Sequence, residues 1–221
     1  MGYSGYKSRR EQRKNRVFLA FVFALAALGA LAVLFAERAA ASENGVVISE
    51  IQPRGPEGGN DEFVELTNAS GEAVNISGYS LEGCAASSGN PSNRATVPEG
   101  ISLAPDESFL LTNDNASGGY SGDVAGDESY GVGISDTGGA RIVDASGAAV
   151  DGVASADGED ECREGEGLDF PTTNSSENAF ERADDGTRDT DDNASDFQGP
   201  QTADPESLSG KENSGGDGSG E

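Results

Sequence analysis

Residues 62–68, with the sequence EFVELTN, decide the fold that the chain is expected to adopt. Val64 and Leu66 fall on one face of an extended segment. Glu65 and Thr67 fall on the opposite face, together with the aromatic residue that precedes Val64. A two-residue period of this kind is typical of a β-strand with one buried face. We therefore expect a strand here whose aliphatic face packs into a core.

Further short apolar segments flank this strand, and each is bounded by Gly, Asn, Asp or Pro. They are VVISEI (46–51), AVNISGYSLEG (73–83), RATVP (94–98), ESFLLTN (107–113), ARIVDA (140–145) and AAVDGVAS (148–155). None of them shows a sustained period of 3.6 residues, which would indicate a helix. Seven or so short strands separated by turn residues predict an all-β, immunoglobulin-like β-sandwich over residues 46–197.

Two of these segments carry more detailed expectations. The apolar parity changes within 73–83, which predicts a β-bulge near Ser77 and Gly78. Residues 140–153 contain two apolar bursts around Ala-Ser-Gly, which predicts a β-hairpin.

Taken in order, the same segments resemble the lamin-tail domain family. The resemblance covers residues 46–197, from VISEI (47–51) and DEFVELTN (61–68) through VNISGYSL (74–81) to FER (180–182) and DTDDNASDF (189–197). It implies an immunoglobulin-like sandwich of the type found in secreted and surface proteins of bacteria and archaea, with a binding or scaffolding role rather than a catalytic one. The residues that match the family's structural motif are Ser49, Glu50, Phe63, Glu65, Leu66, Asn68, Gly78, Tyr79 and Leu81.

Charge divides the chain into three compositions. The 221 residues include 14 basic side chains, 40 acidic ones and no histidine, which gives a formal net charge of −26. Residues 1–16 form a basic segment with a net charge of +5, and residues 17–36 carry no charge. Residues 42–221 hold seven basic and 38 acidic side chains, a net charge of −31.

The uncharged run predicts where the protein is located. Residues 17–36 would span about 30 Å as a helix, which matches the hydrocarbon core of a bilayer. Because the basic segment 1–16 should stay in the cytoplasm, everything after the run is expected to lie outside. The alternative is a signal peptide that is cleaved near Ala41, within the linker at 37–45. We expect an extracytoplasmic protein that is either anchored by a single membrane helix or secreted.

The C-terminal residues 198–221 contain Gly, Ser, Pro and acidic side chains with one leucine. Such a composition buries too little apolar surface to offset the entropy lost on ordering. These residues are predicted to form a disordered acidic tail.

Composition also excludes several functions. Without histidine, the chain has no Ser-His-Asp or Cys-His nucleophile system and no histidine-ligated zinc. Nucleic-acid binding is not expected, because phosphate recognition needs clustered Lys and Arg. The basic surface of chromatin-associated lamin tails has no counterpart in this acidic sequence. We therefore expect neither an enzyme nor a nucleic-acid partner.

Cys84 and Cys162 are the only cysteines, and both follow the apolar run. Two cysteines in an oxidising compartment most simply form one disulfide. Two unrelated thiols are the alternative, and a redox-active pair is disfavoured because the chain has no C-x-x-C motif.

Asp189, Asp191 and Asn193 have the spacing that opens a calcium loop, and Asp196 adds a further oxygen ligand. The glycine and the final bidentate glutamate of an EF-hand loop are missing from this segment. The alternative is therefore a turn in which the same side chains cap backbone amides. No cofactor is expected apart from this weak calcium site.

Glu50 and Glu65 lie within predicted strands, and they would form a carboxylate pair if both faced one cleft. We interpret them instead as strand-surface or structural groups. The function expected is a non-catalytic binding or scaffolding module whose partner is a protein or glycan at the cell surface. The alternatives are a metal-dependent accessory module of a secreted hydrolase or nuclease system and a self-associating envelope component.

Overall fold

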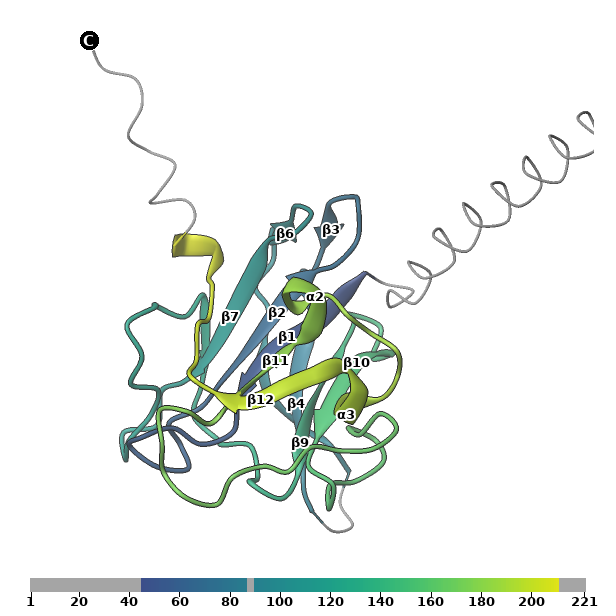
Figure 1. Cartoon of the computed structure of the whole chain (residues 1–221). Coiled ribbons are helices and arrows are strands. Elements are labelled where there is room, and N and C mark those ends of the chain that lie inside the picture. Colours follow the sequence, from purple (N-terminus) through teal and green to yellow (C-terminus); the bar gives the residue numbers. More distant parts are fainter. Residues whose placement is uncertain (1–44, 87–89, 211–221) are drawn as a thin grey trace, which may run out of the picture. The chain divides into compact units, whose positions relative to one another are not determined.

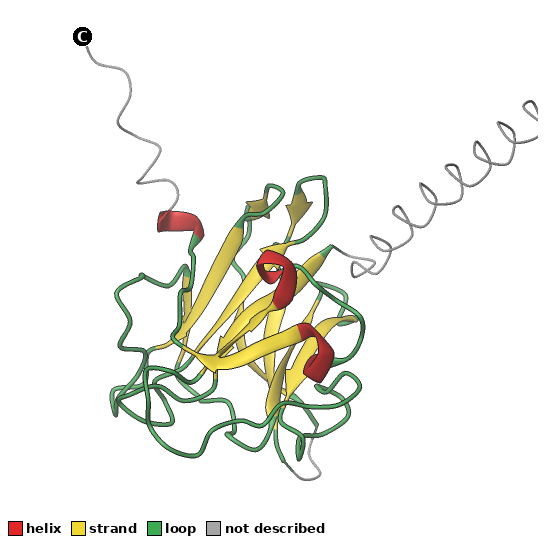
Figure 2. Cartoon of the chain, in the orientation of Figure 1, coloured by secondary structure: helices red, strands yellow, loops and turns green. Residues whose placement is uncertain are grey.

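The computed structural model of the chain describes residues 45–86 and 90–210 (Figure 1). The basic segment 1–16, the apolar run 17–36 and the cleavage region up to residue 44 lie outside the described residues. Among the residues that are described, no helix is long and apolar enough to cross a membrane. The described chain is built mainly from strands and loops, with a few short helical turns (Figure 2).

The larger of the two main sheets has six strands in the spatial order β12-β11-β1-β2-β7-β8. All neighbouring pairs are antiparallel except β7 and β8, which run parallel. Its strands are β1 (Val46–Gln52), β2 (Phe63–Asn68), β7 (Ser108–Asn113), β8 (Glu128–Tyr130), β11 (Ala179–Arg182) and β12 (Phe197–Gln201).

The second main sheet has four antiparallel strands in the order β10-β9-β4-β5. They are β4 (Ser80–Cys84), β5 (Ser92–Thr96), β9 (Gly139–Val143) and β10 (Ala149–Ala154). A two-stranded ladder joins β3 (Val74–Asn75) to β6 (Ser102–Leu103), and two one-turn helices, α2 (Ala183–Gly186) and α3 (Asn193–Asp196), flank β11 and β12.

One apolar core joins the two main sheets. Ile48 and Leu66 contribute from the larger sheet, while Leu81, Ile142 and Val153 contribute from the smaller one. All five side chains are fully or almost fully buried. Two sheets that bury alternate side chains against each other form a sandwich, so the predicted immunoglobulin-like β-sandwich is confirmed.

The predicted hairpin at 140–153 is confirmed, because β9 pairs with β10. Its turn is closed by Asp144, whose carboxylate accepts hydrogen bonds from the amides of Ser146 and Ala148. Gly147 adopts φ +86° in this turn, a left-handed conformation that glycine enters without steric cost.

The predicted bulge near Ser77 and Gly78 is wrong. The segment does not continue as one kinked strand: it divides into β3 and β4, which belong to different sheets. Between them the amide of Tyr79 bonds to the carbonyl of Ile76, and Gly78 adopts φ +77°. The change of parity in the sequence therefore marks a turn that moves the chain from one sheet to the other.

The disordered tail predicted for 198–221 is wrong for residues 198–210. The larger sheet gains its outer strand β12 from Phe197–Gln201, which pairs with β11. Residues 202–210, which we call the strap, then run beside β7 (Figure 1). Leu208 packs against the core and Ser207 is buried. Backbone pairing and polar contacts hold this segment in place. The prediction of disorder considered only how little apolar surface the segment could bury, so it did not take these contacts into account.

Candidate functional site

An acidic cavity of about 330 Å³ lies on the face of the larger sheet that points away from the core. Strands β1, β2, β7 and β11 supply its floor, and α2 and the strap supply its walls. Seven of its lining residues are acidic and none is basic. The lining consists of Ser49, Glu50, Glu65, Thr67, Asp106, Ser108, Glu181, Asp185, Gly186, Asp204 and Glu206.

Three glutamates lie in a row across the floor of the cavity. Glu50 on β1 is the register partner of Glu181 on β11 and of Glu65 on β2. Directly opposed side chains on neighbouring strands have Cβ atoms about 5 Å apart, and like charges in such positions destabilise a sheet. This row is therefore an unfavourable arrangement unless protons or a cation reduce its charge.

Glu65 is held by a network of hydroxyl groups. The hydroxyl groups of Ser49 and Thr67 donate to its Oε1 atom over 2.7 and 3.1 Å. A hydrogen bond of 2.9 Å links Thr67 to Ser108 on the next strand. These contacts fix the Glu65 carboxylate on the cavity floor, where it is only 6 % exposed.

Glu50 is buried more deeply, with 3 % of its surface exposed. Its Oε1 atom accepts a hydrogen bond of 3.1 Å from the amide of Asp204. Burial, reinforced by Glu65 and Glu181, raises the pKa of Glu50 from 4.5 to about 8. Burial also raises the pKa of Glu65. The cavity therefore stores at least one proton near neutral pH.

The strap closes the cavity through its backbone. The amides of Asp204 and Glu206 donate to Glu50 and Glu65, the second over 2.7 Å. Further along, the amides of Leu208 and Ser209 both donate to the carboxylate of Asp127, each over 2.9 Å. Carboxylates of the sandwich thus hold an extended segment by its main chain.

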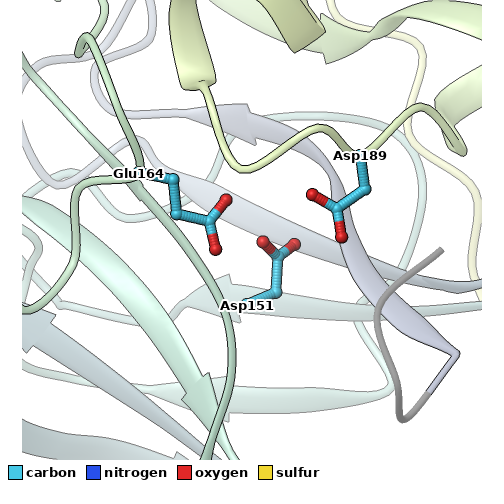
Figure 3. Close-up of side chains that lie close together, drawn as sticks. All are labelled: Asp151, Glu164 and Asp189. Carbon is cyan, nitrogen blue, oxygen red and sulfur yellow. The ribbon is translucent and has the colours of Figure 1, made fainter. Parts of the chain in front are cut away.

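A second acidic cluster surrounds a buried arginine. Asp151, Glu164 and Asp189 point toward one another, with carboxylate oxygens within 4.8 Å (Figure 3). The side chain of Arg182 is fully buried among them, and its Nη2 atom donates to both oxygens of Asp151 over 2.7 and 2.9 Å. Its Nη1 atom lies 3.5 Å from Asp189. The guanidinium therefore supplies the positive charge that this cluster needs.

Burial beside Asp151 raises the pKa of Glu164 to about 9. Asp151 is paired with Arg182, whose Nη2 atom also lies 3.7 Å from Oε2 of Glu164. The arginine also donates to the carbonyl of Ile48, and its guanidinium stacks 4.6 Å from the ring centre of Phe197. The cluster thus fastens β1, β10, β11 and β12 to one another.

The four residues predicted as calcium ligands are found beside this arginine, in a tight capped turn. Asp196 accepts hydrogen bonds from the amide and hydroxyl of Thr190. Asn193 accepts from the amides of Ala154 and Glu164. Asp189 faces Arg182, and Asp191 adopts φ +57° at the exposed tip of the turn. Calcium binding here stays a prediction, and the contacts that the structure shows are those of the alternative, a turn capped by its own side chains.

The predicted disulfide between Cys84 and Cys162 is present. It ties the end of β4 to the loop that follows β10, and both sulfur-bearing residues are buried. The loop it fixes carries Glu164, so the cross-link also positions one member of the arginine cluster.

The motif residues that the resemblance singled out divide between structural positions and the cavity. Phe63, Leu66 and Leu81 are fully buried, and Tyr79 is 9 % exposed. Asn68 is fully buried and donates from its amide group to the carbonyls of Glu72 and Leu103. Gly78 forms the turn between the sheets. Ser49, Glu50 and Glu65 belong to the cavity floor.

Glu50 and Glu65 were interpreted as strand-surface or structural groups, and the strand-surface half is wrong because both are buried under the strap. They do face one cleft, which was the alternative arrangement. The error has the same origin as the tail prediction: a segment expected to be disordered covers them. Asp151 and Arg182 were missed as a site, although Arg182 is one of only seven basic residues after residue 41. The small number of basic residues in this part of the sequence was the signal that could have identified Arg182 as part of a site.

Comparison with known proteins agrees with the fold. The family model of the lamin tail domain matches residues 39–157, more than half of the chain. No curated protein matches the chain. The match contains β1 to β10 and ends before β11, so Glu181, Asp185, Asp204 and Glu206 of the cavity lie beyond it. With its sandwich topology and this match, the chain belongs to the lamin tail domain family.

Proposed function

We propose that the chain is a non-catalytic binding module that holds a protein or glycan partner outside the cytoplasm. The observation that carries this proposal is the acidic cavity, a concave site built from four strands, a turn and the strap. Ligand sites are typically concave with a few convergent polar groups. Family membership supports the proposal, because the lamin tail domain is an immunoglobulin-like module.

Chemistry within the cavity favours binding over turnover. Its hydroxyl groups on Ser49 and Thr67 donate to Glu65, which also accepts the amide of Glu206, so these groups are already paired within the protein. Glu50 and Glu65 have backbone amides of the strap as partners. A pair of carboxylates that accepts N–H groups of its own chain is suited to contact with a cationic partner.

The sequence supports an extracytoplasmic location. The run 17–36 serves as a membrane anchor in the proposal, or as a signal peptide removed near Ala41. Mass spectrometry of the mature N-terminus decides between the two: Met1 indicates an anchor and Ser42 indicates secretion. Resistance of the module to protease added to intact cells, with digestion only after lysis, would contradict both.

The binding role is tested by adding the fluorescently labelled chain to cells that lack it. We expect saturable surface binding that weakens when Glu50 and Glu181 are both changed to Gln. The matched control changes Glu57 and Glu99, which are exposed and outside the cavity, to Gln. Binding that is absent, or that both double variants reduce equally, would refute a cavity-based binding function.

A further inference from the structure

We propose that Asn174 is an N-glycosylation site, at which the side-chain nitrogen receives an oligosaccharide from a lipid diphosphate donor. The inference goes beyond the proposed binding role and rests on one part of that proposal, the location outside the cytoplasm. The way in which the fold sorts the acceptor motifs of the sequence carries it: most of them are built into the structure, while the motif of Asn174 lies on the surface.

The chain contains five Asn-x-Ser motifs in which x is not proline, the acceptor pattern for N-glycosylation. A glycan is bulky and belongs at the protein surface. The sugar is bonded to the side-chain nitrogen, so that atom must be accessible in the folded chain. The five asparagines are Asn68, Asn75, Asn115, Asn174 and Asn193.

Two of these asparagines are fully buried and hold the fold together. Asn68 donates from Nδ2 to the carbonyls of Glu72 and Leu103. Asn193 donates from Nδ2 to the carbonyl of Gly152 over 2.8 Å. A glycan on either nitrogen would disrupt these hydrogen bonds and would have to lie inside the protein. The folded chain therefore excludes both motifs.

Two further motifs are fixed by contacts of their own. Asn115 is partly buried, and its Nδ2 donates to the carbonyl of Gly131 over 3.0 Å, so the atom that would carry the sugar is already bonded. Asn75 is exposed at the end of β3, but the hydroxyl of its motif serine, Ser77, accepts the amide of Gly100 over 2.9 Å. The motif of Asn75 is thus part of the turn between the two sheets, and it could not extend into an enzyme active site without opening that turn.

Asn174 is accessible together with its motif serine. Asn174 and Ser176 are both exposed, and they lie in the loop 171–178, which belongs to no helix or strand. The Oδ1 atom of Asn174 accepts a hydrogen bond of 2.8 Å from Nη1 of Arg54. The oxygen and the nitrogen of a carboxamide are separate groups, so a sugar on Nδ2 is compatible with this contact. Asn174 does not line the acidic cavity, and a glycan attached to it would leave the cavity residues unmodified.

The transfer forms one bond and breaks one bond. Nδ2 of Asn174 attacks the anomeric carbon of the donor sugar, and the bond between this carbon and the diphosphate oxygen breaks. The lipid diphosphate leaves, the nitrogen loses one proton, and nothing is oxidised or reduced. A membrane oligosaccharyltransferase catalyses such a step, which requires the acceptor loop to reach the enzyme outside the cytoplasm.

The test is mass spectrometry of tryptic peptides from the full chain, purified from the cells that naturally produce it. Trypsin cuts after Arg163 and Arg182, so the peptide 164–182 contains Asn174 and no other acceptor motif. We expect this peptide to carry an added mass that fragments into sugar ions and is localised to Asn174.

Variants of the full chain, produced in the same cells, show whether the motif itself is recognised. Asn174→Gln and Ser176→Ala should each lose the added mass completely, whereas Ser176→Thr, which keeps the hydroxyl group, should retain it. The matched control Asn75→Gln changes an exposed asparagine of another motif, and it should leave peptide 164–182 modified.

An unmodified Asn174 in the wild-type chain overturns the inference. Modification of the buried Asn193, which trypsin places on a separate peptide, also overturns it, because accessibility in the folded chain would then not select the site. The protease experiment on intact cells distinguishes the two proposals. If added protease digests the module and Asn174 is unmodified, only this inference fails; if the module is protected until lysis, the proposed location fails as well.

Discussion

At the scale of single residues, Arg182 is the cation that compensates a buried group of carboxylates. Its fully buried guanidinium pairs with Asp151 and lies close to Asp189 and Asp196. Removing one partner of a buried ionic cluster leaves the others uncompensated, which typically costs about 3–5 kcal/mol. We expect Arg182→Met to lower the free energy of unfolding in urea by that amount.

A matched control for this substitution is Arg141→Met, which removes a cross-strand pair with Glu82 at the sheet surface. Both side chains of that pair are about one-fifth exposed, and exposed pairs contribute about 1 kcal/mol or less. Equal losses in the Arg141 and Arg182 variants would contradict the special role of the buried cluster.

Glu50 makes stability depend on pH. Its folded pKa is about 8, well above the ordinary value of 4.5, so between these values the folded state binds more protons than the unfolded state. The free energy of unfolding therefore falls as the pH rises through this window, by up to about 1.4 kcal/mol per pH unit for this group. Glu62, with a pKa raised to about 7 by burial, adds to the same trend.

Urea unfolding at a series of pH values from 4.5 to 9 measures this slope. Glu50→Gln should flatten it without abolishing it, because Glu62 still titrates. Glu99→Gln should leave the slope unchanged, since Glu99 is exposed. A wild-type chain whose stability rises from pH 5 to pH 8 would contradict the prediction.

At the scale of elements, the strap depends on carboxylates more than on apolar contacts. Asp127 accepts the amides of Leu208 and Ser209 and also that of Leu110 on β7. Hydrogen bonds to a charged acceptor are worth about 1.5–3 kcal/mol. We expect Asp127→Asn to speed amide hydrogen exchange at residues 208 and 209 by at least about tenfold, while exchange in β1 changes little.

The comparison for this experiment is Asp123→Asn, an exposed aspartate in the same loop. It should leave exchange in the strap unchanged. Strap amides that already exchange at the rate of an unfolded chain in the wild type would show that the strap is not held as the structure indicates.

The strands illustrate what local sequence could predict. The two-residue period of 62–68 and the hairpin at 140–153 are properties of neighbouring residues, so both were predictable, as was the sandwich that they imply. The strap has no such period. Its position depends on Glu65 and Asp127, which are 141 and 81 residues away from their partners in the sequence. The same long-range pairing creates the cavity, and no local pattern contains it.

At the scale of the whole molecule, the disulfide is the main covalent constraint. The bond between Cys84 and Cys162 joins residues 78 positions apart and was predictable from the cysteine count and the expected compartment. In the chain-entropy model a loop of this length stabilises the folded state by about 4 kcal/mol. Replacing both cysteines with serine should lower the free energy of unfolding toward that amount, and dithiothreitol should have no further effect on the variant. Wild-type stability in the double variant would contradict the role of the bond.

The excess of acidic side chains affects the stability of the whole module. Residues 42–221 carry a net charge of −31, and like charges at the surface repel one another in the compact state. Salt shortens the range of this repulsion from about 10 Å at 0.1 M to about 3 Å at 1 M. The melting temperature should therefore rise by several degrees between 0.05 and 1 M NaCl.

A variant with Glu57, Glu99 and Asp123, all exposed, changed to their amides should melt higher in low salt and gain less from added salt. Because Arg182 and its carboxylates are buried, their attraction is screened much less than the surface repulsion. A melting temperature that falls with salt would mean that attractive surface pairs, and not acidic repulsion, dominate the electrostatics of this protein.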